Sequence, residues 1–530
     1  MTGRLKARCV AGVRDERGAT AVFFAVGLLL LAPATMGMID LYMITTQRGQ
    51  LQDALDTATL YVARSTATSV TDIQNSGDAA LRANLKLPKG QEITSSSFKL
   101  AADKVTIQGH ATITPPTVGP RLWVQADIAA NSEVLRNSNN VEVALVLDTT
   151  GSMELQMDNL RTAAKDLVDL VVKDQQPPAV PYYTKVALVP YSNSVNADTF
   201  ATAARGAIRG PVQITSISKA QPALVTTSAA HNLANGERVR ITGVSDMTNF
   251  NYSVSSTEYE VANRTATTFQ LKSTDSSKYN KAGSGGSVQC MSQDCDLYRF
   301  TTAESKSVVW TPTNCVSERI GAEAYTDAAA DNAWVGRRYY DPSKGASERC
   351  PSAPIVPLST SKTALKSAID KLVDNGGTAG QIGLAWGWYM VSPTFGGMFD
   401  EASRGAAYGT PQTLKVVILM TDGAFNTPYC KGVVAQNAGA NSGSKSTKIN
   451  CDATNGDPFT QAAQLCANMQ KKGIIIYTVG FNVGSEPGVA ALMRNCASAP
   501  ENYYLPNGGA ELKVAFRAIG QDINSLRIAK

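Results

Sequence analysis

Five oxygen-bearing side chains at separate places in the sequence could together bind a hard divalent cation. Each follows a recognisable element and lies in a predicted loop. They are Asp148, Thr150, Ser152, Thr378 and Asp422. Mg²⁺ favours few carboxylates, several neutral oxygens and retained water, which matches two aspartates and three hydroxyls. We therefore expect a divalent-cation site with one open coordination position, with Mg²⁺ as the first choice and Mn²⁺ or Ca²⁺ as alternatives.

Two short apolar runs are expected to position the two carboxylates. Residues 143–147 and 416–420 are uninterrupted and partly β-branched, as in strands buried on both faces of a parallel sheet. Asp148 directly follows the first run, and Thr421 and Asp422 follow the second. Open α/β sheets bind ligands at the carboxyl edge, so both carboxylates are predicted to meet there. Taken alone, the first motif is equally compatible with a turn followed by a helix cap.

The order of these motifs resembles the metal-ion-dependent adhesion site of the von Willebrand factor type A domain. That family has Asp-x-Ser-x-Ser, then a Thr in a later loop, then an Asp after a strand. The matching segments are DTTGS at 148–152, NGGTAGQ with Thr378, and LMTDG with Asp422. The resemblance implies an α/β fold with a doubly wound, mostly parallel sheet, and the five residues above as metal ligands. Thr150 departs from the family, which more often has Ser there, but the hydroxyl ligand is kept.

Catalysis is the least favoured use of such a site. No histidine base is placed beside Ser152, because the two histidines, His110 and His231, fall in predicted β segments away from this edge. Two-metal hydrolysis would need more carboxylates than the site supplies. We therefore expect no enzymatic activity.

One segment near the N-terminus is long and apolar enough to cross a membrane. Residues 18–39 carry no charge, and a helix of about 20 residues spans a bilayer. We predict a transmembrane helix over 18–40 after a short tail, 1–17. Basic residues outnumber acidic ones in that tail, which keeps the N-terminus cytoplasmic and exports the rest. A cleaved signal peptide is the alternative, because Ala32-Pro33-Ala34 has the pattern of a cleavage site.

Charge argues against nucleic acid as a partner, and cysteine usage agrees with export. The 530 residues have a net charge of only +5, and no Arg-rich stripe is present. All cysteines but Cys9 follow the membrane segment, and an even set in an oxidising compartment usually pairs. Sequence alone cannot choose the connectivity. We expect neighbours to pair, as Cys290 with Cys295, Cys315 with Cys350, Cys430 with Cys451, and Cys466 with Cys496.

Periodicity and composition divide the exported part into a helix, a connector and a large domain. Apolar residues at alternating spacings of three and four predict that the helix continues over 41–69 with one apolar stripe. That stripe packs either on the same chain or on a partner helix. Short alternating runs predict a small β connector over 70–138. The type A-like domain is expected over 139–527.

Two insertions are predicted within that domain. Residues 211–290 are dominated by Thr, Ser, Gly and Val, and turn signals such as Asn235-Gly236 predict an inserted all-β module. Residues 291–358 hold three cysteines and many turn formers, which predicts an irregular, disulfide-braced return. Residues 425–457, rich in Asn and Gly, predict an inserted loop that borders the metal edge and could select partners.

The N-terminal segment over 17–63 resembles that of TadE/TadG-like proteins of the tight-adherence (Flp) pilus-assembly system. The matching features are Arg17-Gly18 before the apolar run, Asp40 at its end, and LQDA at 51–54. In the pseudopilin branch a Glu stands five residues after the Gly. This chain has Phe23 at that position, which favours the uncleaved, TadG-like branch.

These expectations describe a single-pass protein of the bacterial inner membrane, with its bulk in the periplasm or at the cell surface. The favoured function is Flp/Tad pilus assembly or adhesion, in which the cation takes an acidic group of a protein partner as its last ligand. A hard cation with an open position gains most from an anionic oxygen. The alternative is a structural scaffold of the pilus-assembly complex, in which the metal only stabilises the domain. The partners expected are other pilus-assembly or surface components.

Overall fold

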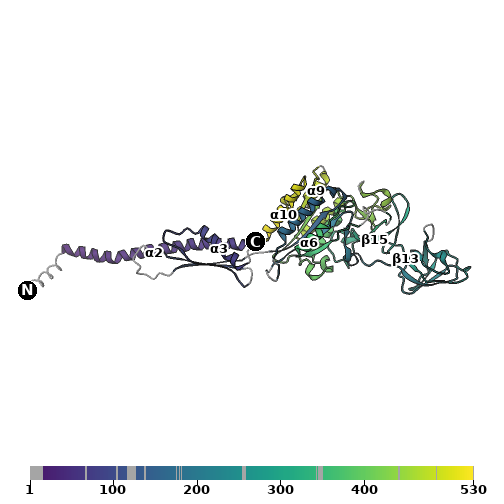
Figure 1. The fold of residues 1–530 in the computed structure, drawn as a ribbon, viewed down its shortest axis with the longest axis horizontal. Helices are drawn as coiled ribbons and strands as arrows, with labels where there is room; N and C mark the ends of the chain where they lie inside the picture. The colour runs from purple at the N-terminus through teal and green to yellow at the C-terminus, as the bar shows by residue number, and fades with distance from the viewer. Residues whose placement is uncertain are drawn as a thin grey trace, which may run out of the picture. The chain divides into compact units, whose positions relative to one another are not determined.

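The computed structural model describes residues 16–528 with some gaps (Figure 1). The gaps are 66–68, 103–105, 116–126, 136–138, 175, 178, 179, 181, 254–257, 342, 344–349, 440, 441 and 485. Most of the predicted cytoplasmic tail, residues 1–15, lies outside the described residues. The chain divides into two units, of which the second is Asn139–Arg527. The second unit contains both α-helices and β-strands, which confirms the mixed α/β class.

The first unit begins with one long helix, α2 (Glu16–Arg64). Its N-terminal half is apolar and exposed, with Phe23 at 78% and Leu29 at 73% of their full exposure. One 18-residue window of the helix has a mean hydropathy of 2.2 and no buried residue. The helix is therefore long and apolar enough to cross a membrane, a property that a signal sequence near the N-terminus shares.

The C-terminal half of α2 packs on its own chain. Its apolar stripe is fully buried and consists of Leu51, Leu55, Ala58 and Val62. The stripe shares one core with helix α3 (Val70–Asn84) and an antiparallel sheet. In sheet order the strands are β1 (Ile93–Leu100), β2 (Thr106–Ile113) and β3 (Ile128–Leu135). Of the two alternatives for the stripe, the structure shows packing on the same chain.

Helix α3 corrects the prediction that residues 70–138 form strands alone. Ser69 caps the helix, because its hydroxyl oxygen accepts a hydrogen bond from the backbone N of Asp72 at 3.0 Å. Gly77 lets the helix approach the sheet closely, since a Cβ there would lie 2.2 Å from the ring of Phe98. Only Ile73, Gly77 and Leu81 are buried along α3. This short apolar stripe in a polar sequence is only a weak indication of a helix. The alternation of apolar and polar residues in the strands that follow therefore led to a prediction of strands for the whole segment.

The second unit is built on a sheet whose central strands are parallel. In sheet order they are β5 (Thr184–Tyr191), β4 (Asn140–Asp148), β18 (Thr413–Thr421), β21 (Ile475–Gly480) and β22 (Tyr503–Tyr504). The first of these strands along the chain, β4, lies between β5 and β18. The carboxyl ends of β4 and β18 are therefore neighbours, which is where ligands bind in open α/β sheets.

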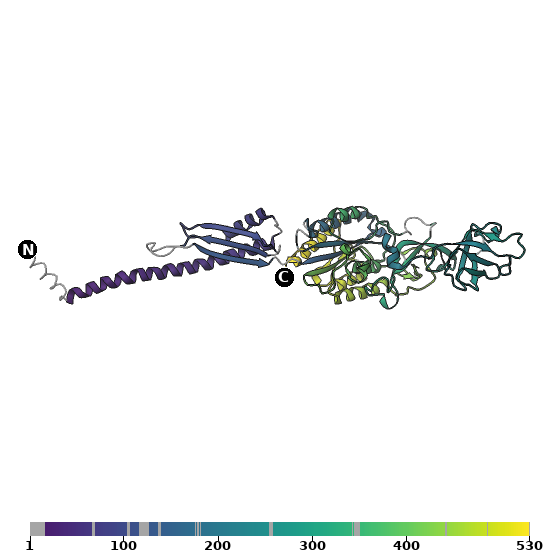
Figure 2. The ribbon, with the colours of Figure 1, turned by 90° about the horizontal axis from the view of Figure 1, so that it is seen from below.

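Helices cover both faces of this sheet (Figure 2). One face carries α4 (Met157–Val171), α6 (Lys362–Asp370) and α10 (Gly509–Ile528). The other carries the short helix α5 (Ala201–Arg205) together with α7 (Gly380–Val391), α8 (Pro458–Lys471) and α9 (Pro487–Cys496). Successive residues of β4 alternate between these two cores, with Leu145 in the first and Val146 in the second. Burial on both faces explains why residues 143–147 and 416–420 form uninterrupted apolar runs.

Helix α7 approaches the sheet through glycine, which gives a testable prediction. A Cβ at Gly387 would lie 2.5 Å from Cγ2 of Val146 on β4. Gly387→Ala is expected to lower the free energy of unfolding by about 1–2 kcal/mol in urea denaturation, because overpacking outweighs the better helix propensity of Ala. Gly488→Ala in α9 is the control, because a Cβ there meets nothing within 4 Å. A stabilised Gly387→Ala protein would contradict the close packing.

Residues 211–290 fold as an antiparallel sheet with a core of its own. The strands are β7 (Val212–Ile217), β8 (Leu224–Thr227), β9 (Arg238–Thr242), β10 (Tyr259–Ala262), β11 (Thr268–Leu271), β12 (Gly283–Ser284) and β13 (Ser287–Cys290). Strand β7 pairs with β8 as well as with β13, which closes the sheet on itself. Val225 and Phe269 are among the fully buried residues of its interior.

The segment predicted as an irregular return, residues 291–358, contains four strands that the prediction missed. It contains β14 (Tyr298–Thr301), β15 (Ser307–Ser317), β16 (Gly336–Tyr340) and β17 (Val356–Ser359). Strand β15 pairs with the short β6 (Val195–Asn196), and β17 pairs with β5, so both extend the main sheet. Pro312 and the register shift that follows it within β15 obscure the strand pattern in the sequence.

The inserted loop over 425–457 packs against these added strands. It contains the hairpin of β19 (Tyr429–Cys430) and β20 (Val433–Val434). Val433 and Ile449 share a small core with Trp310 and Tyr339. The expected cysteine pairs are all confirmed. The disulfides join Cys290 to Cys295, Cys315 to Cys350, Cys430 to Cys451, and Cys466 to Cys496.

Candidate metal centre

Asp148 is the last residue of β4 and is fully buried. Its Oδ1 accepts hydrogen bonds from the backbone N of Thr150 at 2.9 Å and from the Thr150 hydroxyl at 2.6 Å. These bonds turn the chain sharply at the sheet edge, as Asp does in an Asx-turn. The 3₁₀ helix η1 (Gly151–Gln156) follows, and it carries Ser152 at its start.

A continuous chain of hydrogen bonds joins four of the five predicted ligands. The Thr150 hydroxyl lies 2.9 Å from the Ser152 hydroxyl. The Ser152 hydroxyl in turn donates to Oδ1 of Asp422 at 2.8 Å. Asp422 comes from the end of β18, 270 residues away in sequence. The predicted meeting of the two motifs at one sheet edge is thus what the structure shows.

Thr378 lies in a loop that contacts the first motif through its backbone. The backbone N of Gly151 donates to the carbonyl of Gly376 at 3.1 Å. Gly376 has a φ of 76°, and a Cβ at Gly377 would lie 2.8 Å from Oγ1 of Thr427, so both positions need glycine. Within the described part of the chain, no hydrogen bond joins the Thr378 side chain to the other four residues.

Two further residues, Tyr191 and Thr421, belong to the site but were not predicted as site residues. Oδ2 of Asp148 lies 3.1 Å from the Tyr191 hydroxyl and accepts a hydrogen bond from the Thr421 hydroxyl at 2.8 Å. Tyr191 ends β5 directly beside Asp148 in the sheet register. The sequence could have indicated Thr421, because it directly precedes Asp422 at the strand end. The sequence could not indicate Tyr191, because its contact with Asp148 depends on how the strands pair.

The electrostatics of the site favour a bound cation. Burial raises the pKa of the Asp148 carboxyl above its ordinary value. Burial, and then the nearby Asp148, raise the pKa of Asp422 to about 7. Among the described residues, neither carboxylate forms an ion pair with Lys or Arg. Two like charges, one buried and one half-buried, without a basic partner are stabilised by a metal ion.

The donor set fits a small hard cation. It offers two carboxylates and the hydroxyls of Thr150 and Ser152, all oxygen ligands of the kind that Mg²⁺ takes. Thr378 would add a third hydroxyl from the neighbouring loop. Ser152 is exposed and Asp422 is half-buried, so the site opens to solvent. The bound ion would supply positive charge and an open coordination position there.

Comparison with protein-family models and with curated proteins gives no match. Solved structures similar to this chain include the pilus adhesin SpaC of Lactobacillus rhamnosus GG, at 12% identity and a TM-score of 0.30. The alignment covers 84% of this chain but 36% of SpaC.

A second similar structure is the vWF domain of the type V pili tip protein Mfa5 of Porphyromonas gingivalis. It has 10% identity and a TM-score of 0.33 over 74% of this chain and 97% of that domain. A third is mussel byssus proximal thread matrix protein 1 with a zinc-occupied MIDAS motif. It has 12% identity and a TM-score of 0.27 over 73% of this chain and 46% of that one.

Proposed function

We propose that the second unit is a von Willebrand type A-like domain whose cation binds an acidic group on a protein partner. The observation that carries this proposal is the linked pair of Asp148, which is buried, and Asp422, which is half-buried, joined through hydroxyls at a sheet edge. The strand order, with β4 central and helices on both faces, supports a doubly wound sheet of that family. Ser152 is exposed, which gives a partner access to the ion.

We infer that the protein acts while anchored in the bacterial inner membrane by residues 18–40, with its N-terminus in the cytoplasm. The exposed apolar half of α2 and the basic tail before it support this topology. The TadE/TadG-like features of residues 17–63 support a role in Flp/Tad pilus assembly or adhesion. The partner is then another pilus-assembly or surface component that presents a carboxylate.

The proposal is tested in cells by replacing Asp422 with Asn. Pilus assembly or adhesion is expected to fall at least about tenfold, because losing one ligand costs that much or more in metal affinity. Export and abundance of the protein are expected to stay unchanged. Asp158→Asn is the matched control, since that side chain is 95% exposed on α4. Normal assembly in the Asp422→Asn strain would contradict the proposal.

A structural scaffold is the second candidate function. The observation that favours it is the saturation of Asp148, whose two oxygens are in contact with Thr150, Tyr191 and Thr421. In that case the metal only stabilises the domain. Protease resistance and abundance of the Asp422→Asn protein would then fall in step with assembly, whereas the favoured proposal expects assembly alone to fall.

We further propose that the protein is not an enzyme. His231 is engaged inside the β module, where its Nδ1 accepts a hydrogen bond from the backbone N of Leu233 at 3.0 Å. His110 lies on β2 of the first unit and contacts Asn131. Turnover of a phosphoester or a peptide by the purified, Mg²⁺-loaded protein would contradict this proposal.

A further inference from the structure

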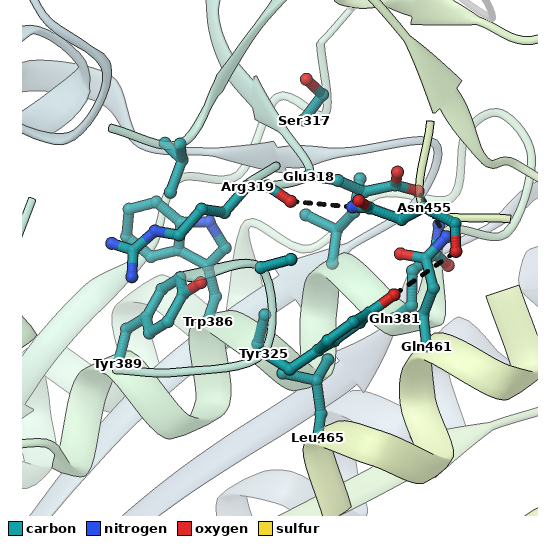
Figure 3. A pocket seen from close by; sticks show the side chains of 14 residues that line it. Ser317, Glu318, Arg319, Tyr325, Gln381, Trp386, Tyr389, Asn455, Gln461 and Leu465 are labelled. Atoms are coloured by element: carbon teal, nitrogen blue, oxygen red, sulfur yellow. Dashed lines mark hydrogen bonds between the residues drawn. The ribbon is translucent and has the colours of Figure 1, made fainter. Parts of the chain in front are cut away.

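Glu318, just beyond the end of β15, is a buried carboxyl without a basic partner. It is 7% exposed, and it forms no ion pair among the described residues. Its Oε1 accepts hydrogen bonds from Nε2 of Gln381 at 2.8 Å and from Nε2 of Gln461 at 3.3 Å (Figure 3). Burial raises the pKa of Glu318 to about 7, although these bonds and the backbone of Tyr429 act in the opposite direction.

The other polar atoms beside Glu318 favour the protonated, neutral form of its carboxyl. Oε2 of Glu318 and Oε1 of Gln381 are buried acceptors without a hydrogen-bond donor. Both residues line a cavity of about 20 Å³, which is room for a single water. A protonated Glu318 can donate to the Gln381 oxygen, directly or through that water. An ionised Glu318 leaves two acceptors and a net charge around the cavity.

Three other titratable groups line the cavity beside Glu318, namely Arg319, Tyr325 and Tyr389, and burial raises the pKa of Tyr389. Tyr325 lines the same cavity, and the negative charge of Glu318 contributes to the raised pKa of Tyr325, after burial. Arg319 also lines the cavity, but its guanidinium lies over the rings of Tyr389 and Phe395, at 5.1 and 5.2 Å from their centroids. Among the described residues, none of the three forms an ion pair or a hydrogen bond with the carboxyl of Glu318.

Hydrogen bonds connect Glu318 to the loop that holds Thr378. Nε2 of Gln381 also donates to the carbonyl of Thr427 at 3.0 Å. The Thr427 hydroxyl donates to Oδ1 of Asn426 at 2.8 Å. The same Oδ1 accepts from the backbone N of Thr378 at 3.0 Å, and the backbone N of Asn426 donates to the Thr378 carbonyl at 2.9 Å. Gln381 itself stands three residues after Thr378, in the first turn of α7.

We propose that Glu318 is a positioning residue for the metal site, which acts through Gln381 and Asn426 on Thr378 and supports cation binding in its neutral form. This inference rests on the proposed function, because it takes Thr378 as a ligand. The raised pKa means that the neutral carboxyl contributes stability that is fully present below about 4.5, its ordinary pKa, and is lost as the pH rises from there to about 7. The Thr378 loop then loses support.

The test compares Mg²⁺ affinity of the full chain in detergent by calorimetry, for wild type, Glu318→Gln and Glu318→Ala. Glu318→Gln imitates the neutral acid, because its amide can donate to Gln381. The ratio of wild-type Kd to Glu318→Gln Kd is expected near one at about pH 6 and about fivefold at about pH 8, the lower end of coupling between linked sites. The titration of Asp148 and Asp422 cancels in this ratio, since both proteins contain them.

Hydrogen exchange of the metal-free proteins gives a second readout. Amide protection at Thr378 and Asn426 is expected to fall in Glu318→Ala and to be restored in Glu318→Gln. Glu501→Gln, at an exposed carboxyl, is the control. A flat Kd ratio with unchanged exchange overturns the role of Glu318 while leaving the metal site intact. Absence of Mg²⁺ binding by the wild type would instead overturn the proposed function.

Discussion

Asp422→Asn is expected to abolish the stabilisation that Mg²⁺ gives to the protein. At about 100 times its Kd a ligand adds about 2.7 kcal/mol, which corresponds to a rise of about 3 °C in the melting temperature of a unit of this size. The wild type should show this rise in a thermal-shift assay, and the variant should show none. Without metal, the variant is expected to be at least as stable as the wild type, because one of two neighbouring like charges is gone.

Asp158→Asn serves as the control in the same assay and should respond to Mg²⁺ as the wild type does. An Mg²⁺-induced rise that persists in Asp422→Asn would show that the ion binds elsewhere. A variant that is unstable without metal would show that Asp422 matters for folding itself.

Lys415→Met is expected to lower the free energy of unfolding by about 3–5 kcal/mol, because it leaves a buried carboxylate without its partner. Nζ of Lys415 and Oε2 of Glu142 are 2.5 Å apart, with side-chain exposures of 6% and 0%. Nζ also donates to the carbonyl of Val391 at 2.8 Å. Urea denaturation at neutral pH measures the effect.

The double variant Lys415→Met with Glu142→Gln is the matched control, since it removes both charges. At least about 2 kcal/mol of the loss should be recovered, because replacing a buried ion pair as a whole costs much less than breaking it. A Lys415→Met protein as stable as the wild type would contradict the burial of this pair.

The sequence predicted the parts of the site that follow from strand patterns. The two apolar runs before Asp148 and Asp422 indicated buried parallel strands, and the shared sheet edge then brought both carboxylates together. The sequence did not predict the Lys415–Glu142 pair, although each residue interrupts an apolar strand. Their contact depends on the register of β18 against β4, where they are direct partners.

Other features depend on tertiary contacts that leave little local signal. Tyr191 reaches Asp148 because β5 pairs with β4. The strand β15 carries a proline and a register shift, so its β character was missed, and with it the burial of Glu318 beside α7. The helix α3 has only three buried residues along one face. In each case, packing decides the structure where local pattern is weak.

Metal-mediated contact with an acidic protein partner is tested by a capture experiment. The full-length protein is cross-linked in intact bacterial envelopes and purified with Mg²⁺ or with a chelator, beside Asp422→Asn and Asp158→Asn. We expect a partner to be recovered with wild type and Asp158→Asn in Mg²⁺, and to be lost with the chelator or with Asp422→Asn. Recovery of the same partner after chelation, or with Asp422→Asn, would contradict it.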